Sequence, residues 1–464
     1  MLLKLRKPLY FIFACMVFQT VILAQDQDAI YEITNIRIVG NDKTKEFVIH
    51  RELTFSIGDS ISYLAIDSEL EKSLLNLKNT SLFNFVTVEH HPVDDRYTEV
   101  LIVVTERWYV WPFPILNVAD PNFNTWLETK NLARINWGSM IMNRNFRGRK
   151  EKLGFVFQLG YSKKVGCFYD VPYTKKHQNL GFGAYASYFQ NYEVVYGTNR
   201  NKRLFTRPTG KSKEEWYNAL YLKYRNKIFV SHQLIGVFQD VVVEDSIVIN
   251  NPNYFGDGAS RMKSLGLKYV FKDDHRDNKS YPLKGYFLKA EFQHNGFSLF
   301  SDKSFTKLET EVKKFDKIGN NFYWASSIKG KFTFEEVQPY YFQNMLGYSD
   351  FVRGYEYYVI DGKYALLMKS NIKYKVASSK KTILPVVRNP GISNFHYAFY
   401  LNAFADIGYV GDAYFNNNLL ANNTMVGYGV GLDFVTYYDK VIRVEFSTNK
   451  LNEFGFFLHF VQPI

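Results

Sequence analysis

One pattern constrains this chain more than any other: strand-length segments alternate apolar with polar residues, and lysines gather on the polar face. Within residues 322–334 the large apolar side chains share one face of an extended strand: Phe322, Trp324, Ile328, Phe332 and Phe334. Lys329 and Lys331 lie on the opposite face, and the segments 153–161 and 366–376 repeat the alternation. A lysine cannot point into the packed core of a soluble sandwich, but it can point into a water-filled lumen. The pattern therefore predicts a transmembrane β-barrel with an apolar outside and a polar inside.

The barrel is predicted to occupy residues 108–464. Aromatic residues beside prolines in the stretch 108–114 suit a chain that enters the membrane interface, and no helical periodicity persists beyond it. With strands of ~10 residues, short turns on one side and longer loops on the other, about 16 antiparallel strands fit. The predicted fold class is thus an all-β transmembrane barrel preceded by one α+β domain. A large secreted β-sandwich is the competing interpretation of the same aromatic-rich composition.

The N-terminus has the features of an export signal. A basic start precedes an apolar run that ends at Ala24, which predicts a cleavable signal peptide at residues 1–24. Cys15 lies inside this run and is interpreted as incidental, with a lipoprotein cleavage site as the alternative. After cleavage only Cys167 remains in the sequence, so neither an internal disulfide nor a cysteine-based metal site is expected.

The chain is basic, with a formal net charge of +12. Its lysines and arginines are scattered along the sequence and do not gather into the basic stripe that nucleic-acid binding requires. On a barrel, such residues face anionic lipid or lipopolysaccharide phosphates. Outer-membrane lipid and lipopolysaccharide are therefore expected partners, and nucleic acid is not.

Residues 30–107 form a separate unit with a different periodicity. The pattern predicts a first strand, a short helix capped by Thr44 and a second helix that begins near Asp67. Two further strands follow at 85–89 and 100–104. This order describes an α+β unit whose helices cover one face of a small sheet.

A second informative stretch is Asp350–Tyr355, where Arg353 and Gly354 stand between apolar and aromatic residues. A solvated loop gains nothing from those apolar neighbours, and a regular strand would not interrupt its packing with glycine. The stretch is therefore predicted to fold back into a confined space. There Gly354 lets the backbone approach a wall, and Arg353 needs a carboxylate partner.

Two inward-facing acids are candidates for that partner. Alternation along 397–408 places Asp406 inside, and alternation along 426–434 places Asp433 inside together with three glycines, which leave room for a loop. Breaking a buried arginine–carboxylate pair from one side costs roughly 3–5 kcal/mol, so such a pair would hold the loop in place. The alternative is that each acid is satisfied by nearby lysines.

These residues carry a resemblance to a known family. The stretch Val352, Arg353, Gly354 and Tyr355 resembles the motif of the inserted loop in the BamA/TamA superfamily of outer-membrane assembly factors, the bacterial surface antigen family. Phe404–Gly408 is similar to its F-x-D-x-G strand motif, whose acid holds that arginine. Two turns are also similar to the family's, at the following positions: Asp274, Arg276, Asp277, Pro282 and Gly285 in one, and Asn145–Arg149 in the other.

The resemblance extends to both ends of the chain. Residues 30–107 resemble a POTRA domain, a periplasmic module that pairs with client strands by edge addition. A simple spacer domain is the alternative. Gly455, Leu458 and Phe460 resemble the terminal strand signal by which outer-membrane barrels are recognised for assembly, although a four-residue tail follows here. A single POTRA domain also departs from the multi-domain members.

The resemblance implies an outer-membrane protein that inserts or translocates client polypeptides. Unfolded barrel precursors or secreted clients would bind the POTRA edge, and accessory lipoproteins are possible partners. A dedicated secretion or lipid-export channel of the two-partner-secretion type, and a passive porin, are the alternatives. No G-x-S-x-G, P-loop or H-E-x-x-H motif is present, so an enzyme is not expected, and neither is a cofactor or a metal.

Overall fold

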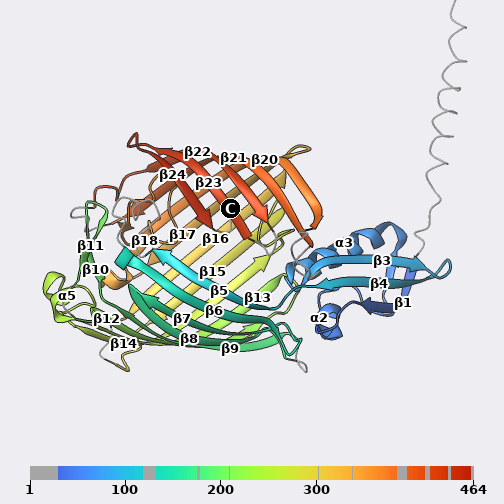
Figure 1. The fold of residues 1–464 in the computed structure, drawn as a ribbon, viewed down its shortest axis with the longest axis horizontal. Coiled ribbons are helices and arrows are strands. Elements are labelled where there is room, and N and C mark those ends of the chain that lie inside the picture. Colours follow the sequence, from blue (N-terminus) through green and yellow to red (C-terminus); the bar gives the residue numbers. More distant parts are fainter. Residues whose placement is uncertain are drawn as a thin grey trace, which may run out of the picture.

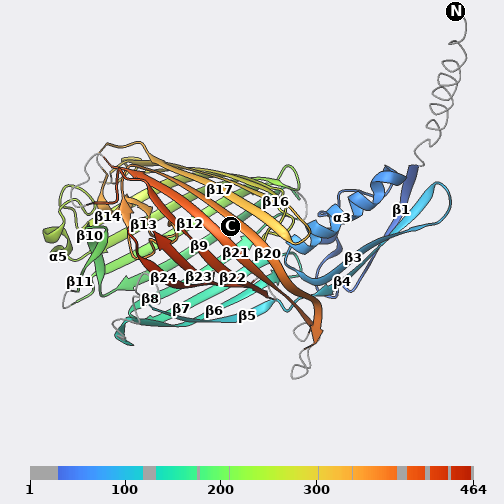
Figure 2. The same cartoon turned by 90° about the horizontal axis from the view of Figure 1, so that it is seen from above.

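A computed structural model describes residues 30–118, 132–174, 178–207, 210–300, 303–336, 338–383, 394–412, 418–436 and 440–460. The predicted signal peptide at 1–24 and the tail at 461–464 lie outside the described residues. The described chain forms a large curved sheet and a smaller N-terminal α+β unit beyond one end of it (Figures 1 and 2).

The large sheet contains 16 strands, and every neighbouring pair in it is antiparallel. It curls into a barrel, as Figures 1 and 2 show. In the order of the chain its strands are β5 (Val110–Val118), β6 (Ile135–Phe146), β7 (Glu151–Gly160), β8 (Ser162–Val171), β9 (Leu180–Asn191), β12 (Lys213–Tyr224), β13 (Val230–Val243), β14 (Arg261–Asp274), β15 (Gly285–Asn295), β16 (Phe305–Lys317), β17 (Phe322–Thr333), β20 (Tyr364–Ile383), β21 (Asn394–Gly411), β22 (Met425–Thr436), β23 (Lys440–Asn449) and β24 (Phe454–Phe460). The predicted all-β architecture and the expected number of strands are confirmed.

Burial along these strands is inverted relative to a soluble protein. Phe322 and Phe332 of β17 are 46% and 40% exposed, whereas Lys331 on the opposite face is only 6% exposed. Lys373 of β20 is fully buried. Because strand side chains alternate strictly between the two faces, this inversion follows from the sequence pattern. The apolar face is therefore the outside of the barrel.

The N-terminal unit is a four-stranded sheet with the order β2-β1-β4-β3. Its elements are β1 (Ile30–Val39), α2 (Glu46–His50), β2 (Ser60–Ser62), α3 (Tyr63–Asn79), β3 (Phe83–Pro92) and β4 (Tyr97–Glu106). Helix α3 buries Ile66, Leu70 and Leu77 on one stripe against the sheet, which is the spacing of an amphipathic helix.

Two details differ from the prediction. Helix α3 begins at Tyr63, four residues earlier than expected, directly after the short strand β2. Thr44 does not cap helix α2, whose N-cap is Lys45 without a side-chain hydrogen bond. The Thr44 hydroxyl instead contacts the Tyr109 hydroxyl at 2.9 Å and accepts a hydrogen bond from Asn145. The Thr44 hydroxyl is therefore used in a tertiary contact and is not used to cap helix α2.

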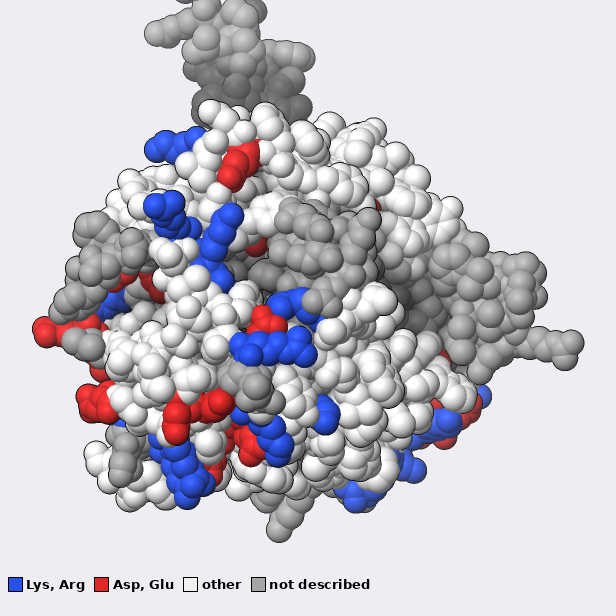
Figure 3. Space-filling view, turned by 60° about the vertical axis from the view of Figure 1, so that its left-hand side comes forward, with Lys and Arg blue, Asp and Glu red and all other residues white. Residues whose placement is uncertain are grey.

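Connections between the barrel strands differ at the two ends. Most of those at the end nearest the N-terminal unit are short, whereas the opposite end carries longer loops (Figure 1). The ordered elements of the long loops are η1 (Leu132–Arg134), β10 (Val194–Asn199), β11 (Lys202–Thr206), α5 (Asp245–Asn250), η2 (Tyr340–Phe342), β18 (Asn344–Leu346) and β19 (Ile360–Asp361). On this loop-bearing face, Lys and Arg side chains lie interspersed with Asp and Glu (Figure 3). None of the helices in the described ranges has the length and apolarity needed to cross a membrane.

The loops at this end are tied to one another. Asn201, at the tip of the β10–β11 hairpin, is only 1% exposed. Its side chain donates to the Val359 carbonyl and accepts from the Leu420 amide, and its own carbonyl accepts from the Val359 amide. Three loops from distant parts of the sequence therefore meet at Asn201, at the loop-bearing end of the barrel.

Candidate functional site

The segment 347–359 connects β18 to β19, and we call it the lumenal loop from here on. It lies against the inner wall of the barrel. Val352, Arg353 and Tyr355 are each 2% exposed, and Gly354 has a φ of +90°. A residue with a side chain rarely adopts this backbone conformation, so glycine is needed at that position. The loop thus buries the motif that the sequence placed in a confined space.

Arg353 is held mainly by Asp406 of β21. Its Nε donates to Oδ2 at 2.8 Å, its Nη2 donates to Oδ1, and its backbone N–H also donates to Oδ2 at 3.1 Å. The Arg353 guanidinium stacks on the Phe404 ring at 3.8 Å. Asp406 is fully buried, so this carboxylate is shielded from solvent screening.

The inner wall leaves room for the loop at its glycines. A Cβ added to Gly427 of β22 would lie 1.7 Å from the Arg353 carbonyl oxygen, and one added to Gly408 would lie 2.3 Å from Val352. Any side chain at Gly427 would therefore displace the loop backbone. Of the three inward glycines predicted along 426–434, only Gly427 receives the loop; Gly429 faces Phe404, and Gly431 faces Glu445 and Asn402 of the wall.

Asp433, the second predicted partner of Arg353, has different partners. It accepts two hydrogen bonds from Arg443 of β23, at 2.6 and 2.8 Å, and one from the Tyr281 hydroxyl at 2.8 Å. Asn402 donates to it at 2.9 Å. Asp433 is therefore connected to Arg353 only through intermediate side chains.

The connection runs through Glu445, which sequence reasoning missed. Glu445 is 2% exposed and accepts from Arg353 Nη1 at 3.2 Å, and it lies 3.5 Å from Arg443. Lys369 of β20 lies 3.8 Å from Asp406. Six charges alternate in sign across β20–β23, and we call this set the Arg353 cluster: Lys369, Asp406, Arg353, Glu445, Arg443 and Asp433. Alternation along β23 would have placed Arg443 and Glu445 inside.

The first residue of the stretch Asp350–Tyr355 is also paired. Asp350 accepts from Lys329 at 2.8 Å and lies 2.7 Å from Lys331, both on the inner face of β17. The lumenal loop is thus fixed at one point by its own carboxylate and at another by its arginine. The wall lysines that marked the lumen in the sequence hold this loop.

The lumenal loop also contacts the end of the barrel. The Phe351 ring stacks on His459 of β24, and the Tyr358 hydroxyl donates to Glu453 at 2.6 Å. Asn449 donates to the Gly354 carbonyl at 2.7 Å. In the predicted C-terminal signal, Leu458 points outward, 41% exposed, and Gly455 leaves the space that the Phe457 ring fills. Phe460 ends the described strand and pairs with Ile442.

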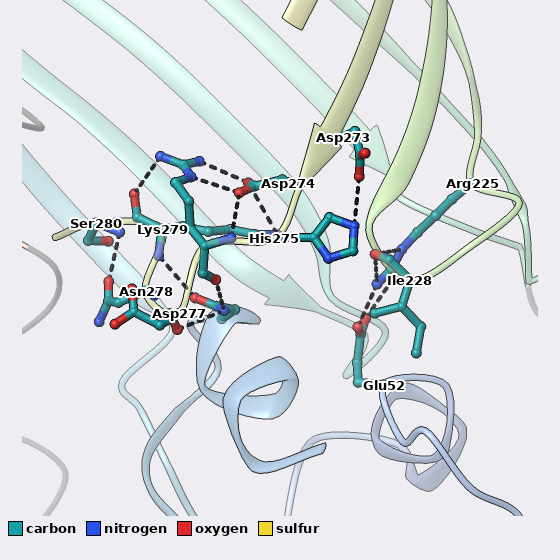
Figure 4. A network of polar contacts seen from close by, with 12 residues as sticks. Glu52, Arg225, Ile228, Asp273, Asp274, His275, Asp277, Asn278, Lys279 and Ser280 are labelled. Carbon is teal, nitrogen blue, oxygen red and sulfur yellow. Dashed lines mark hydrogen bonds and ion pairs between the residues drawn. The ribbon is translucent and has the colours of Figure 1, made fainter. Parts of the chain in front are cut away.

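The predicted turn motif lies at the other end of the barrel, beside the N-terminal unit (Figure 4). Asp274 accepts two hydrogen bonds from Arg276, at 2.7 and 2.8 Å, which fixes the turn between β14 and β15. Asp277 accepts from the Leu283 amide at 3.0 Å. Asn79, at the end of α3, donates to the carbonyls of Arg276 and Asp277. The motif therefore shapes a turn that docks the N-terminal unit.

A buried ion pair completes this contact, which we call the domain junction. Glu52, after helix α2, accepts from Arg225 at 2.8 and 2.7 Å (Figure 4). Its carboxylate also lies 3.5 Å from Lys150. Burial alone would raise the pKa of Glu52, but Lys150 and Arg225 outweigh it and hold that pKa well below its ordinary value. The turn 145–149 adds a backbone bond, in which the Lys45 amide donates to Gly148.

The two ends of the 16-stranded sheet are β5 and β24, and across the described residues neither has a second strand partner. The Arg144 amide donates to the Tyr109 carbonyl, which makes these two residues a hydrogen-bonded pair of β6 and the start of β5. Backbone groups alternate in direction along an antiparallel strand. The residues whose backbone groups point away from β6 are therefore Val110, Pro112, Pro114, Leu116 and Val118.

The same reasoning applies to β24. The Asn449 amide donates to the Glu453 carbonyl, so the backbone groups that point away from β23 belong to Phe454, Phe456, Leu458 and Phe460. We call these two outer edges the seam. Proline has no N–H, so β5 lacks two of its five outward donors at the centre of the strand. The seam cannot form a complete ladder between its own two strands.

Within the described ranges, no group of three or more His, Cys, Asp or Glu residues is placed to hold a metal ion. The lumen and the domain junction are lined mainly by charged side chains, backbone donors and aromatic rings. Their geometry suits the holding of loops and strands.

Comparisons with known proteins place the fold. Residues 145–436 match the family described as the Omp85 superfamily domain, and no curated protein matches the chain significantly. The crystal structure of BamA from Haemophilus ducreyi lacking POTRA domains 1–3 is 13% identical, with a TM-score of 0.52 over 93% of this chain and 83% of that one. CdiB from Escherichia coli is 12% identical, with a TM-score of 0.55 over 93% of this chain and 74% of that one. At such identities the two structures share the fold with this chain.

Proposed function

This chain belongs to the Omp85 superfamily, and from that premise we propose that it inserts or translocates client polypeptides at the outer membrane. The observation that carries the proposal is the seam, whose two edges have no second strand partner among the described residues. A strand edge without a strand partner is costly in lipid, so an incoming client strand would be stabilised by pairing with either edge.

The prolines of β5 support this use of the seam. If β5 and β24 paired directly, Pro112 and Pro114 would leave two β24 carbonyls without donors. Each unsatisfied group in the hydrocarbon region costs several kcal/mol. Self-closure of the seam is therefore weakened, whereas a client strand can pair with the outer edge of β24, which contains no proline. Pro112 and Pro114 favour exchange of partners at the seam.

We assign the three parts of the chain corresponding roles. Residues 1–24 are proposed as a signal peptide, 30–107 as a periplasmic POTRA domain and 108–464 as the membrane barrel. Strand β3 is the edge of the small sheet and has one strand partner, β4, among the described residues. A client in an extended conformation can add to β3 through backbone hydrogen bonds before it reaches the seam.

The lumenal loop, in this proposal, braces the strands on one side of the seam. The Arg353 cluster fixes β20–β23 from within, and the loop contacts β24 through His459 and Glu453. Because β23 is held rigidly, it stays in the sheet, and a client strand would displace β24 at most. We propose that the loop keeps the opening local.

A dedicated channel for one secreted client is the second candidate, and the fold shared with CdiB favours it. The two candidates use the same seam or lumen but differ in the range of clients. A passive porin is disfavoured because the lumenal loop lies inside the barrel and is tied through Asn201 to two other loops at the same end. Steady ion conductance of the unmodified chain in planar bilayers would favour the porin.

The seam can be tested by placing a photo-reactive amino acid at Leu458 on the outer edge of β24. A matched control places it at Val312 of β16, which is also exposed on the outside, at 48%, but lies in the middle of the sheet. We expect client precursors to crosslink at Leu458 and not at Val312. Capture of varied barrel precursors indicates an insertase, and capture of one secreted protein indicates a dedicated channel. Equal capture at both sites, or at neither, would contradict the proposal.

The role of the prolines has its own test, Pro112→Val combined with Pro114→Val. This variant restores two outward N–H donors, so we expect slower amide hydrogen exchange in β24 and less client capture at Leu458. Ile115→Val, in the same strand, leaves the pattern of donors unchanged and serves as the control. Unchanged amide hydrogen exchange of β24 in the double variant would show that the prolines do not weaken the closure of the seam.

A further inference from the structure

A cavity of about 430 Å³ lies at the domain junction, between the N-terminal unit and the turns of the barrel. Its described lining carries seven lysines and arginines but only two carboxylates, Glu52 and Asp274. Those carboxylates are already engaged. Glu52 binds Arg225 and Lys150, and Asp274 binds Arg276. The cavity therefore has a surplus of positive charge.

Lys223 pairs with Asp170, which lies outside the lining, and Lys279 lies 4.0 Å from Asp274, so three cations of the described lining remain without a carboxylate. Among the described residues, Arg51, Lys152 and Lys272 have no carboxylate within ion-pair distance, although all three line the cavity. Arg51 belongs to the N-terminal unit, Lys152 to β7 and Lys272 to β14. The unpaired charges thus come from both bodies that the cavity separates.

Two polar groups in the lining also lack partners. Tyr173 is 3% exposed, and within the described chain its buried hydroxyl has no hydrogen-bond partner. The Arg51 guanidinium stacks on the Tyr173 ring at 3.7 Å, and its buried Nη1 is likewise without an acceptor in the described chain. Buried donors are nearly always satisfied by protein, water or a ligand, so these two donors are open to an acceptor from outside the described chain.

We propose that this cavity binds a small anion that carries phosphate groups, with Arg51, Lys152 and Lys272 as counter-charges and Tyr173 as a hydrogen-bond donor. One carboxylate would neutralise one of the three cations, whereas each phosphate carries about two negative charges and three strong acceptor oxygens. Arginine and lysine are the residues that bind phosphate in proteins. Such a ligand would join the N-terminal unit to the barrel.

The electrostatics of the nearby turns agree with this assignment. Burial lowers the pKa of Lys150 to about 8, and the positive charge of Arg225 adds to this effect. Burial and Arg225 also lower the pKa of Arg51. A bound anion would favour the charged forms of both groups. The described lining of the cavity includes no residue of β5 or β24, so anion binding there can be tested independently of how the protein handles clients.

The test uses the purified full chain in detergent and inorganic pyrophosphate as the probe, titrated by calorimetry against sodium chloride of matched ionic strength. We expect saturable binding of one pyrophosphate, weakened about tenfold or more in Arg51→Gln and in Lys272→Gln, because a charge-assisted hydrogen bond contributes about 1.5–3 kcal/mol. Tyr173→Phe removes one donor and should weaken binding by a smaller factor. Lys72→Gln, on the exposed surface of α3, is the control and should leave binding unchanged.

Two outcomes would overturn the inference. One is the absence of saturable binding, and the other is equal binding by the wild-type chain and both cavity variants, which would indicate non-specific attraction to a basic protein. Heat-modifiable mobility on gels establishes that each variant retains a folded barrel. Pyrophosphate binding in nanodiscs of phosphatidylglycerol and of phosphatidylcholine distinguishes the sources: competition by phosphatidylglycerol alone identifies a lipid headgroup, and equal binding in both identifies a soluble phosphate.

Discussion

The Arg353 cluster and the domain junction are both buried networks of charge, but they differ in balance. The cluster sets three cations against three carboxylates, alternating across four strands. The junction cavity has seven cations in its described lining, three of which (Arg51, Lys152 and Lys272) have no carboxylate within ion-pair distance among the described residues. A balanced network satisfies its own charges and holds its parts in one arrangement, whereas an unbalanced one is completed by something from outside. The lumenal loop is therefore fixed in place, and the junction is where a ligand can act.

The largest expected effect comes from breaking the balanced network. Asp406→Ala leaves Lys369 without its carboxylate and Arg353 with Glu445 alone. Removing one partner of a buried pair costs roughly 3–5 kcal/mol. We expect the barrel to lose its heat-resistant mobility at a markedly lower urea concentration. Asp240→Ala breaks an ion pair with the exposed Arg261, and there we expect a loss of about 0–1 kcal/mol. Equal losses in the two variants would show that the cluster is not special.

A smaller effect is expected at the junction. Glu52→Gln removes the charge that Arg225 and Lys150 face, and a hydrogen bond to a charged group contributes about 1.5–3 kcal/mol. We expect protease to cleave between the N-terminal unit and the barrel more rapidly in this variant, while the barrel itself stays intact. If phosphate occupies the cavity, pyrophosphate replaces the negative charge that Glu52→Gln removes. Cleavage of this variant should therefore be slower in pyrophosphate than in sodium chloride of the same ionic strength.

Strong acid should loosen the docking of the N-terminal unit as Glu52→Gln does, because it neutralises the same carboxylate. The pKa of Glu52 is lowered in the folded protein, so its contribution to stability is fully present above the unfolded pKa of about 4.3. That contribution is lost as the pH falls through the lower folded value. Docking of the N-terminal unit, followed by protease sensitivity, should therefore persist at pH 5 in the wild-type chain. Loss of docking between pH 7 and pH 5 would contradict this assignment.

The smallest expected effect comes from crowding the loop without touching a charge. An alanine methyl at Gly427 would overlap the Arg353 carbonyl, and overpacking typically costs about 1–3 kcal/mol. Gly236→Ala is the matched control, since a Cβ at that strand glycine meets no atom within 4 Å. We expect lower thermal stability in Gly427→Ala alone. A similar result for both glycines would mean that the loop yields easily.

The sequence predicts what depends on local periodicity. Strand alternation assigns Asp406 and Asp433 to the inside because side chains of an extended chain alternate strictly between faces. It does not predict which acid meets Arg353, since that choice depends on how a loop from between β17 and β20 aligns with β21–β23. Arg443 lies opposite Asp433 in the register and binds it. Register and loop placement are non-local, and no spacing within one segment encodes them.

The contacts of the domain junction could not be predicted from local sequence patterns either, because they join segments that are far apart in the sequence. Thr44 is a residue type that often caps helices. Its hydroxyl instead accepts a hydrogen bond from Asn145, which lies in a turn 101 residues away. Glu52 is an unremarkable acid in the sequence, and its partners Lys150 and Arg225 come from two different turns. The turn motif at Asp274–Asp277 was recognisable by resemblance, whereas its contact with Asn79 emerges only in the fold.

A charge-exchange cycle tests most directly whether Arg353 and Asp406 hold the loop inside the barrel. The variants are Arg353→Glu, Asp406→Arg and the two combined, each assayed for heat-modifiable mobility. We expect each single change to abolish the compact barrel and the combination to recover part of it; recovery is partial because Glu445 lies 3.2 Å from the arginine. If neither single change alters the mobility, the pair does not hold the loop, and the account of the lumen is wrong.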